Sequence, residues 1–450
     1  MSNRIKLDNK YIENIIQLIE NQKTTKLAEV INNIHIADLA EIMQNLTNEN
    51  AKYFYNLISN EKKAAAVLIE LEDDTRKDLL QNLSAKEIAE EVIENLATDD
   101  ATDIMGGLSE DKKQEVLSHI EDVEHASDIT DLLNYPKDTA GGLMAKELIK
   151  VNKNWNTVQC LKEMRKQANN IKTVYTIYVV DDNDSLLGLM SLRKLLLTEK
   201  ATAVKDIMFT DIISVKATEK NEYVANMMQK YDLVVLPVVS DSGTLLGRIT
   251  IDDVMDVAKE EAEKDYQMAS GISESIESND SIWEVTRARI PWLLIGILGG
   301  LFGAKIIGIF DLERNFELAF FIPLIAAMGG NVGIQSAAIV VQGLANDSLK
   351  MDNIFQKIIK ELGVGLLNGA ICSLIILISA FGLGYSIKLS LTVSLSLLIV
   401  IIFAALFGTL TPLTLKTYNI DPALATGPFI TTINDVLGLF IYFWISQSII

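Results

Sequence analysis

Residues 422–450 run PALATGPFITTINDVLGLFIYFWISQSII and contain one charged side chain, Asp435. A membrane-spanning helix needs ~20 mostly apolar residues, because ~30 Å of hydrocarbon is crossed at ~1.5 Å per residue. This stretch is long enough, and Asp435 lies near its middle, with 13 residues before it and 15 after it. A carboxylate at mid-membrane costs at least ~2.5 kcal/mol, which indicates a functional site unless a neighbouring helix supplies a partner.

Four further stretches meet the same criteria, so the sequence predicts a membrane part with five spans. A buried helix of a soluble protein explains any one stretch, but not five in succession. Basic residues at the span ends lie mainly on the side of the soluble part, which predicts a cytoplasmic N-terminus and a C-terminus outside the cell (inner) membrane. The four stretches are Ile290–Phe310, Leu318–Asn346, Leu362–Ile387 and Leu389–Leu415.

The beginning of the last span carries two prolines with different expected effects. Asp421 followed by Pro422 is typical of a helix N-cap and first helical residue. Pro428 cannot donate a hydrogen bond to the carbonyl of Leu424, so we expect a break in the helix there. Carbonyl oxygens freed by such a break can face a cavity.

Polar side chains predict the lining of an ion pathway. Thr431 and Thr432 lie four and three residues before Asp435, so we expect them on its face. Asn331 and Gln335, four apart in MGGNVGIQSA of the second span, predict a polar seam, although glycine-mediated helix packing explains the glycines alone. Carboxylate, hydroxyl and carbonyl oxygens are the ligands of hard cations such as Mg²⁺. We therefore expect a pore lined by Asn331, Gln335, Leu424, Pro428, Thr431 and Thr432.

One carboxylate per chain cannot neutralise a divalent cation. A two-fold homodimer brings two copies of Asp435 to a shared axis and supplies two negative charges. Because Mg²⁺ gives up its waters reluctantly, we expect it to pass with much of its hydration shell.

The excess of acid lies entirely outside the membrane part. From Ser281 onward there are 9 Lys and Arg against 9 Asp and Glu, so the first 280 residues hold 31 against 51 of the totals 40 and 60. This balance disfavours nucleic acid as a partner and favours cations. No Walker loop, nucleophile motif or metal-hydrolase spacing is present, so we do not expect an enzyme.

The middle of the chain contains a repeat. IYVVDDNDSLLGLMSLR (177–193) aligns without gaps on LPVVSDSGTLLGRITID (236–252), and each copy predicts strand, turn, strand and helix. The repeat resembles a pair of CBS domains, which bind adenine nucleotides in related proteins. Thr250 and Asp252 match ribose-contacting positions of that family, but the first copy has Ser191 and Arg193 there, so ATP binding is left open.

Short amphipathic helices are predicted before the repeat, with recurring turns AEIMQNL (40–46), KDLLQNL (77–83) and TDIMGGL (102–108). After the repeat, an acidic helix runs towards the first span, although a solvated helix face is an equal explanation for its acids. The predicted architecture is an all-α superhelical domain (1–134), an α/β CBS pair (135–257), an acidic connecting helix (258–283) and a five-helix transmembrane domain (284–450), with ten membrane helices in the homodimer.

These parts, in this order, resemble the MgtE family of magnesium transporters over essentially the whole chain. The motifs are YPKDTAGGLM (135–144), TIDDVMDV (250–257), MGGNVGIQSA (328–337), KELGVGLL (360–367) and DPALATGPFITTINDVLG (421–438). The resemblance implies a homodimeric Mg²⁺ channel with an ion site at Asp435. It also implies closure by cytosolic Mg²⁺, which bridges acidic residues between the soluble parts.

The bridging set follows from matching motif positions and stays an implication of the resemblance. It comprises Asp99, Asp103, Glu222, Asp232, Asp253, Asp256, Glu261 and Asp265. Two positions depart from the family pattern. Lys264 stands where another acid is common, and Gly427 stands where some members have Asn.

We therefore expect a membrane protein that imports Mg²⁺ and is regulated by it, with lipid, divalent cations and a second copy as its partners. The main alternative is a membrane-anchored CBS receptor that signals without conducting. A carrier or exporter of another divalent cation is the nearer competitor. Asp435 and the proline-broken helix argue against a mere anchor, because an anchor has no use for either.

Overall fold

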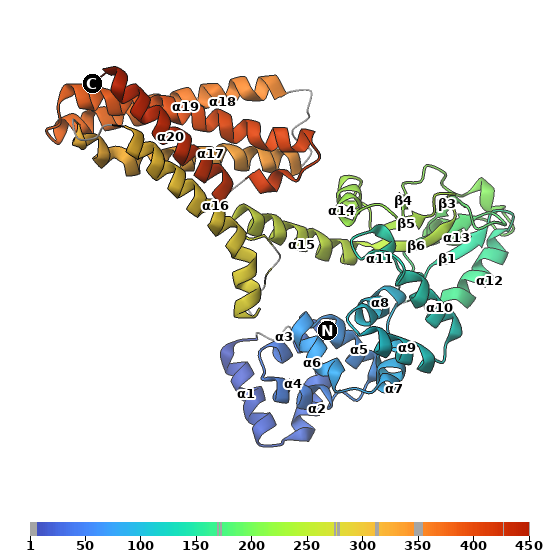
Figure 1. Ribbon diagram of the computed structural model, residues 1–450. Helices are drawn as coiled ribbons and strands as arrows, with labels where there is room; N and C mark the ends of the chain where they lie inside the picture. The colour runs from blue at the N-terminus through green and yellow to red at the C-terminus, as the bar shows by residue number, and fades with distance from the viewer. Residues whose placement is uncertain are drawn as a thin grey trace. The chain divides into compact units, whose positions relative to one another are not determined.

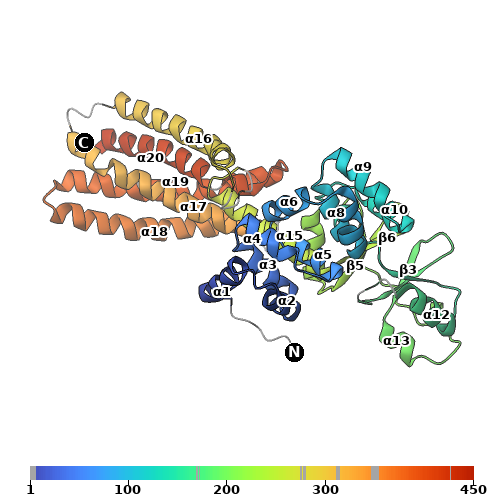
Figure 2. The same ribbon diagram turned by 90° about the horizontal axis from the view of Figure 1, so that it is seen from below.

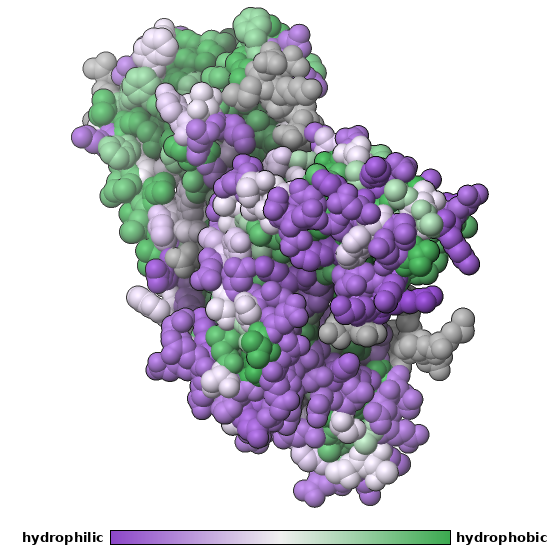
Figure 3. Space-filling view, turned by 90° about the vertical axis from the view of Figure 1, so that its right-hand side faces the viewer, coloured by the Kyte–Doolittle hydropathy of each residue, from purple (hydrophilic) through white to green (hydrophobic). Residues whose placement is uncertain are grey.

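The computed structural model describes residues 7–168, 171, 173–273, 276, 280–310, 315–345, 354–425 and 427–449. The chain divides into two compact units, residues 1–258 and 259–450, and each is described by itself. Figure 1 shows the elements of both units, and in the space-filling view hydrophobic side chains gather on the membrane helices while hydrophilic ones cover much of the rest (Figure 3).

The N-terminal region of the first unit is all-α, as predicted, and its helices share one apolar core. The three recurring turns each end a helix at the same position, with α3, α6 and α8 followed by Asn45, Asn82 and Gly107. The elements are α1 (Asn9–Glu20), α2 (Thr24–Asn33), α3 (Ile36–Gln44), α4 (Asn48–Tyr55), α5 (Glu61–Ile69), α6 (Asp73–Gln81), α7 (Ala85–Glu87), the π-helix η1 (Ile88–Val92), the 3-10 helix η2 (Ile93–Asn95), α8 (Thr98–Gly106), α9 (Glu110–His119) and α10 (Val123–Leu132).

The rest of the first unit contains two three-stranded sheets of identical topology, which confirms the predicted repeat. In each sheet the middle strand pairs in parallel with the first strand and antiparallel with the third. The elements are α11 (Ala140–Leu143), β1 (Ile149–Asn152), α12 (Thr157–Gln167), β2 (Ile177–Val180), β3 (Leu186–Met190), α13 (Leu192–Leu197), η4 (Val204–Asp206), β4 (Val215–Lys216), α14 (Asn221–Lys230), β5 (Val235–Val239) and β6 (Leu245–Thr250), followed by α15 (Ile251–Ala269).

The two copies also pair with each other through equivalent turns. Ser185 forms a bridge with Thr244, its counterpart in the second copy. The Leu186 N–H donates to the Gly243 carbonyl and the Leu245 N–H to the Asp184 carbonyl. Such reciprocal bonding between equivalent positions gives the pair an approximate two-fold relation.

Within its described residues, the second unit contains five helices that are long and apolar enough to span a membrane, as predicted. In Figure 2, α16 to α20 lie along one another as a bundle. The most buried of the five is α19, whose apolar core includes Leu397, Val400 and Ile401. The elements are α16 (Ile282–Ile309), the 3-10 helix η5 (Phe316–Phe321), α17 (Ile322–Ala345), α18 (Ile354–Gly382), α19 (Ile387–Thr417), the 3-10 helix η7 (Pro422–Ala425) and α20 (Pro428–Ile449).

Several predicted boundaries differ from those of the structure, including the end of the third span at Gly382 rather than Ile387. The first membrane helix begins at Ile282, eight residues earlier than predicted, because Ser281 and Glu284 form a capping box. The predicted connecting segment 258–283 is not one helix, since α15 ends at Ala269 and Gly271 follows with φ +80°. Helix α18 begins at Ile354 rather than Leu362. The predicted ends Asn346 and Ile450 lie outside the described residues.

Candidate functional site

The start of α20 is interrupted rather than kinked. Asp421 accepts a hydrogen bond from the Ala423 N–H at 2.8 Å, as an N-cap does, but it caps only the 3-10 helix η7. The α-helix begins at Pro428, directly after Gly427 with φ +59°. Proline suits the first helical position, where no N–H is needed. The predicted N-cap and the predicted break are therefore both present, but the helix that Pro422 begins is the 3-10 helix η7 and not the α-helix.

Asp435 lies on the side of α20 that meets the glycine-rich part of α17, and its side chain is half-buried. A β-carbon built on Gly330 would lie 3.5 Å from Oδ1 of Asp435 and 3.0 Å from Cγ2 of Thr431. Among the described residues, no basic side chain forms an ion pair with Asp435. The Asp435 carboxylate thus lies within the apolar unit, next to Gly330 of α17, which has no side chain.

The two threonines before Asp435 face different neighbours. Thr431 lies beside Asp435 towards α17, and its hydroxyl donates to the Gly427 carbonyl at 3.1 Å. Thr432 instead packs against Gly299 of α16. Thr431 and Asp435 therefore both face α17, whereas Thr432 faces α16.

The predicted polar seam of α17 lies on a face that the chain leaves uncovered. Asn331 and Gln335 are both exposed, whereas Gly330 and Gly333 face α20. Leu424, in η7, is 38% exposed. Exposed amides in hydrocarbon are unfavourable, so this face of α17 requires water or another chain against it.

Two buried polar groups near this site were not foreseen from the sequence. Asn434 is 1% exposed and packs against Gly333, and neither atom of its amide has a hydrogen-bond partner among the described residues. Glu361 of α18 is 5% exposed and accepts a hydrogen bond from Ser336 of α17 at 2.6 Å. Glu361 directly precedes the predicted third span, so an earlier boundary would have revealed a second acid within the membrane unit.

The end of α15 touches the break before α20. A β-carbon on Gly427 would lie 2.6 Å from the carbonyl oxygen of Ala269, and one on Gly271 would lie 2.6 Å from Cγ of Pro428. Both glycines have positive φ angles, which L side chains adopt at a cost. The end of α15 therefore lies against the first residue of α20.

In the first unit, three of the predicted regulatory acids lie close enough to affect one another, and we call Asp99, Asp103 and Asp253 the junction acids. Burial raises the pKa of Asp99 well above its ordinary value, and the carboxylates of Asp100, Asp253 and Glu147 raise it further. Loss of solvation raises the pKa of Asp103, against the opposing effect of Lys137. Loss of solvation also raises the pKa of Asp253, although Thr250 donates two hydrogen bonds to the Asp253 carboxylate.

Glu147 is part of this junction and was missed by sequence reasoning. Its two carboxylate oxygens accept hydrogen bonds from the backbone N–H of Thr98 at 2.8 Å and from the Thr98 hydroxyl at 2.9 Å. Thr98 begins α8, so Glu147 caps the helix that carries Asp99 and Asp103. A single glutamate before a strand gives no sequence signal for such a long-range contact.

The other predicted regulatory acids lie on or next to α14 and on α15. Glu222 and Asp232 are exposed at the two ends of α14, and Asp256 and Asp265 are exposed on α15. The Glu261 carboxylate forms an ion pair with Nζ of Lys264 at 3.3 Å. Lys264, which departs from the family pattern, therefore pairs with a side chain that was predicted to bind Mg²⁺. Within the described part of the chain, no three His, Cys, Asp or Glu residues converge on a metal position.

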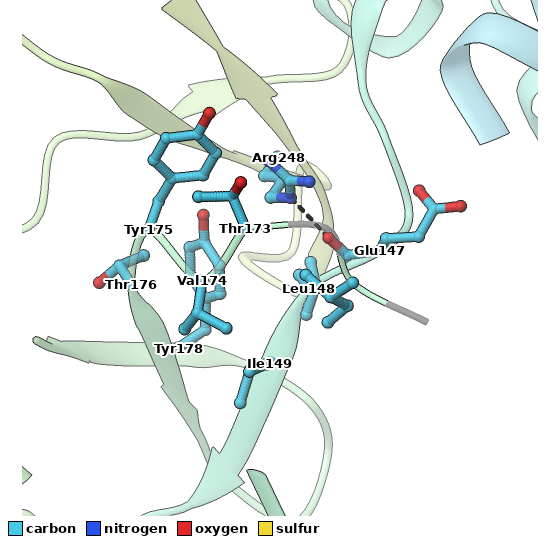
Figure 4. A pocket seen from close by; sticks show the side chains of 10 residues that line it. Glu147, Leu148, Ile149, Thr173, Val174, Tyr175, Thr176, Tyr178 and Arg248 are labelled. Carbon is cyan, nitrogen blue, oxygen red and sulfur yellow. Dashed lines mark hydrogen bonds between the residues drawn. The ribbon is translucent and has the colours of Figure 1, made fainter. Parts of the chain in front are cut away.

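A small recess lies where β1 and the segment before β2 approach β6 (Figure 4). The Arg248 Nε donates to the Glu147 carbonyl at 2.5 Å, and its guanidinium lies 5.6 Å from the centroid of the Tyr175 ring. Nη1 of Arg248 and the hydroxyl of Tyr178 are buried without a partner among the described residues. The predicted nucleotide contacts Thr250 and Asp252 do not line this recess.

Comparisons with known proteins agree with this arrangement. Residues 322–445 match the MgtE family model, described as a divalent cation transporter. Residues 34–138 match the MgtE intracellular N domain, and residues 140–199 and 204–260 match CBS domains.

Relatives of similar length extend the match across the units. The magnesium transporter MgtE of Bacillus subtilis (strain 168) is 33% identical over 321 residues, which cover 71% of each chain. That of Thermus thermophilus is 34% identical over 338 residues, covering 74% of this chain and 75% of the relative. A crystal structure of the cytosolic domain of the Mg²⁺ channel MgtE in complex with ATP is 31% identical, with a TM-score of 0.51, and covers 55% of this chain and 99% of that one. The chain belongs to the MgtE family.

Proposed function

We propose that this protein imports Mg²⁺ across the cell membrane through a pore that two copies of the chain form together. The observation that carries the proposal is Asp435, a half-buried acid without an ion-pair partner in the described part of the chain, about two turns after the start of the membrane helix α20. Relatives that are 33% and 34% identical carry the name magnesium transporter. The protein acts in transport and is not an enzyme.

The homodimer is supported by charge and by exposed polar surface. One carboxylate does not balance Mg²⁺, whereas two copies of Asp435 across a two-fold axis do. Asn331 and Gln335 lie on an uncovered face of α17 within the membrane unit. Such a face is stable against water in a pore or against the partner, where its amides find hydrogen bonds. With Thr431 and the carbonyls around Pro428, it supplies oxygens to a hydrated ion.

Regulation by cytosolic Mg²⁺ is supported by the junction acids. Their raised pKa values reflect loss of solvation and mutual repulsion, both of which a bridging divalent cation relieves. Mg²⁺ therefore favours the compact arrangement of the soluble parts, with Glu222, Asp232, Asp256, Glu261 and Asp265 as further ligands. The contact between the end of α15 and Pro428 carries this change to the pore helix.

ATP is the second ligand that we propose, at the CBS pair. The support is a relative's cytosolic domain whose structure contains ATP. In this chain the recess beside Arg248 and Tyr175 offers an aromatic face and an unpartnered guanidinium nitrogen, which suit a base and an anion. We place the ligand there rather than at Thr250 and Asp252.

The proposed orientation has the N-terminus and the soluble domains in the cytoplasm and the C-terminus outside. The test of transport is Mg²⁺ uptake in cells that lack other Mg²⁺ importers. We expect Asp435→Ala to abolish uptake at wild-type expression. Asp421→Asn, which removes a negative charge outside α20 but keeps an oxygen that can cap η7, is the matched control and retains uptake. Normal uptake by Asp435→Ala would refute the pore, and the protein would then be a non-conducting sensor.

A further inference from the structure

Glu361 is a buried acid of the membrane unit that the proposed ion pathway does not use. It lies about two turns after the start of α18 at Ile354 and is 5% exposed. Its Oε1 accepts a hydrogen bond from the buried Ser336 hydroxyl of α17 at 2.6 Å. No basic side chain within the described residues forms an ion pair with it. A group this costly to bury in a membrane protein calls for a role.

Glu361 reaches α17 from a side different from the uncovered polar face. Successive residues of an α-helix are rotated by about 100°, so Ser336 lies about 140° around the helix from Asn331. Asn331 is exposed, whereas Ser336 is 4% exposed. A hydrated ion at the uncovered face is therefore out of reach of the Glu361 carboxylate.

The segment that Glu361 holds is the one against which Asp435 lies. Ser336 follows Gly333 by one turn, and Gly333 packs against the Asn434 side chain. Gly330, one further turn back, lies beside Asp435. Gly333 also touches Gly408 of α19, so α17 meets α19 backbone to backbone and meets α20 through the Asn434 side chain. Where helices touch backbone to side chain, a small rotation of α17 displaces the groups around Asp435.

We propose that Glu361 is a positioning residue that acts through Ser336 to hold the glycine-rich segment of α17 in register with Asp435. It serves as a hydrogen-bond acceptor and not as a charge. This inference rests on the proposed function, because it matters to transport only if Asp435 binds the ion.

The test measures two quantities on the purified full-length protein. These are the Mg²⁺ concentration for half-maximal flux into liposomes and the midpoint of thermal unfolding in detergent. An interhelical hydrogen bond in a membrane protein changes an equilibrium by about 3-fold to 15-fold. We expect Glu361→Ala and Ser336→Ala each to raise the half-saturating Mg²⁺ concentration by that factor, and the double variant to do no more. Glu361→Gln, whose carbonyl accepts the same bond, should stay within about twofold of wild type.

Ser373→Ala is the matched control. It removes a buried hydrogen bond from Ser373 to the Ser394 carbonyl at 2.8 Å, which joins α18 to α19 without involving α17. We expect it to lower the unfolding midpoint but to leave the half-saturating Mg²⁺ concentration unchanged. A purely structural role for Glu361 would give its alanine variant that same pattern and would overturn the proposal.

A role as a charged ion ligand would also overturn it. In that case Glu361→Gln would fail like Glu361→Ala, while Glu361→Asp would retain flux. Failure of the proposed function is a separate result, because it shows as wild-type flux through Asp435→Asn, whatever the Glu361 variants do.

Discussion

Replacement of Gly427 by alanine should disrupt the contact between α15 and the pore helix. Gly427 has φ +59°, a backbone conformation that costs an L side chain about 1–2 kcal/mol. A β-carbon there would also lie 2.6 Å from the Ala269 carbonyl oxygen, which is shorter than van der Waals contact. The end of α15 must therefore move away from Pro428 for alanine to fit.

The expected loss of stability follows from the conformational cost of an L side chain at residue 427. A loss of about 1–2 kcal/mol changes a two-state ratio by roughly 5-fold to 30-fold. For residues 259–450, a unit of nearly 200 residues, the same loss lowers the unfolding midpoint by roughly 2–8 °C. Because we propose that the closing signal passes through this contact, we expect the Mg²⁺ concentration that half-inhibits flux to shift by a similar 5-fold to 30-fold.

Thermal unfolding in detergent and liposome flux at varied internal Mg²⁺ measure these two effects. Gly296→Ala is the matched control, since Gly296 lies in α16 with no atom within 4 Å of an added β-carbon. There alanine favours the helix by roughly 0.5–1 kcal/mol, so stability should hold or rise. Wild-type stability and wild-type Mg²⁺ inhibition in Gly427→Ala would refute the proposed coupling between α15 and α20.

Three further predictions concern the soluble part. Because the junction acids have raised pKa values when they are close together, the compact state binds more protons, and it should gain stability as the pH falls from neutral towards the ordinary pKa range of a carboxyl group. Small-angle scattering without Mg²⁺ should then show compaction at low pH, and a pH-independent radius would contradict this reasoning. Asp253→Asn should weaken the protection by Mg²⁺ against protease, whereas Asp241→Asn, a surface acid paired with Lys216, should not. Arg248→Ala should lower ATP affinity by at least tenfold in calorimetry, and unchanged affinity would remove ATP from the recess.

The features predictable from the sequence were those that short-range patterns determine. Five apolar stretches predicted the membrane unit, and the ungapped repeat predicted strand, turn, strand and helix in each copy. The structure adds a third strand to each sheet and a bulge at the same place in each, after Val179 and after Val238. Asp435 was identifiable because a charge inside an apolar run is conspicuous. Pro428 marked the break before α20 because proline cannot continue a hydrogen-bonded turn.

The features that were missed depend on contacts between distant segments. Glu361 directly precedes an apolar run, and nothing in the local sequence shows that it is buried and bonded to Ser336 of α17. Glu147 gives no local signal that it caps α8, because Thr98 is 49 residues away in the chain. Thr432 shares a helical face with Asp435 by spacing, yet Gly299 of α16 accommodates its methyl group. Spacing along one helix does not reveal which neighbouring helix leaves room for a side chain.

The most direct test of the account is Mg²⁺ flux into liposomes that contain the purified protein, reported by a trapped Mg²⁺-sensitive dye. The account predicts flux through the wild type that falls as Mg²⁺ rises on the side of the soluble domains. It also predicts no flux above that of empty liposomes through Asp435→Ala. Flux through Asp435→Ala at the wild-type rate would contradict the claim that Asp435 is the ion site of the pore.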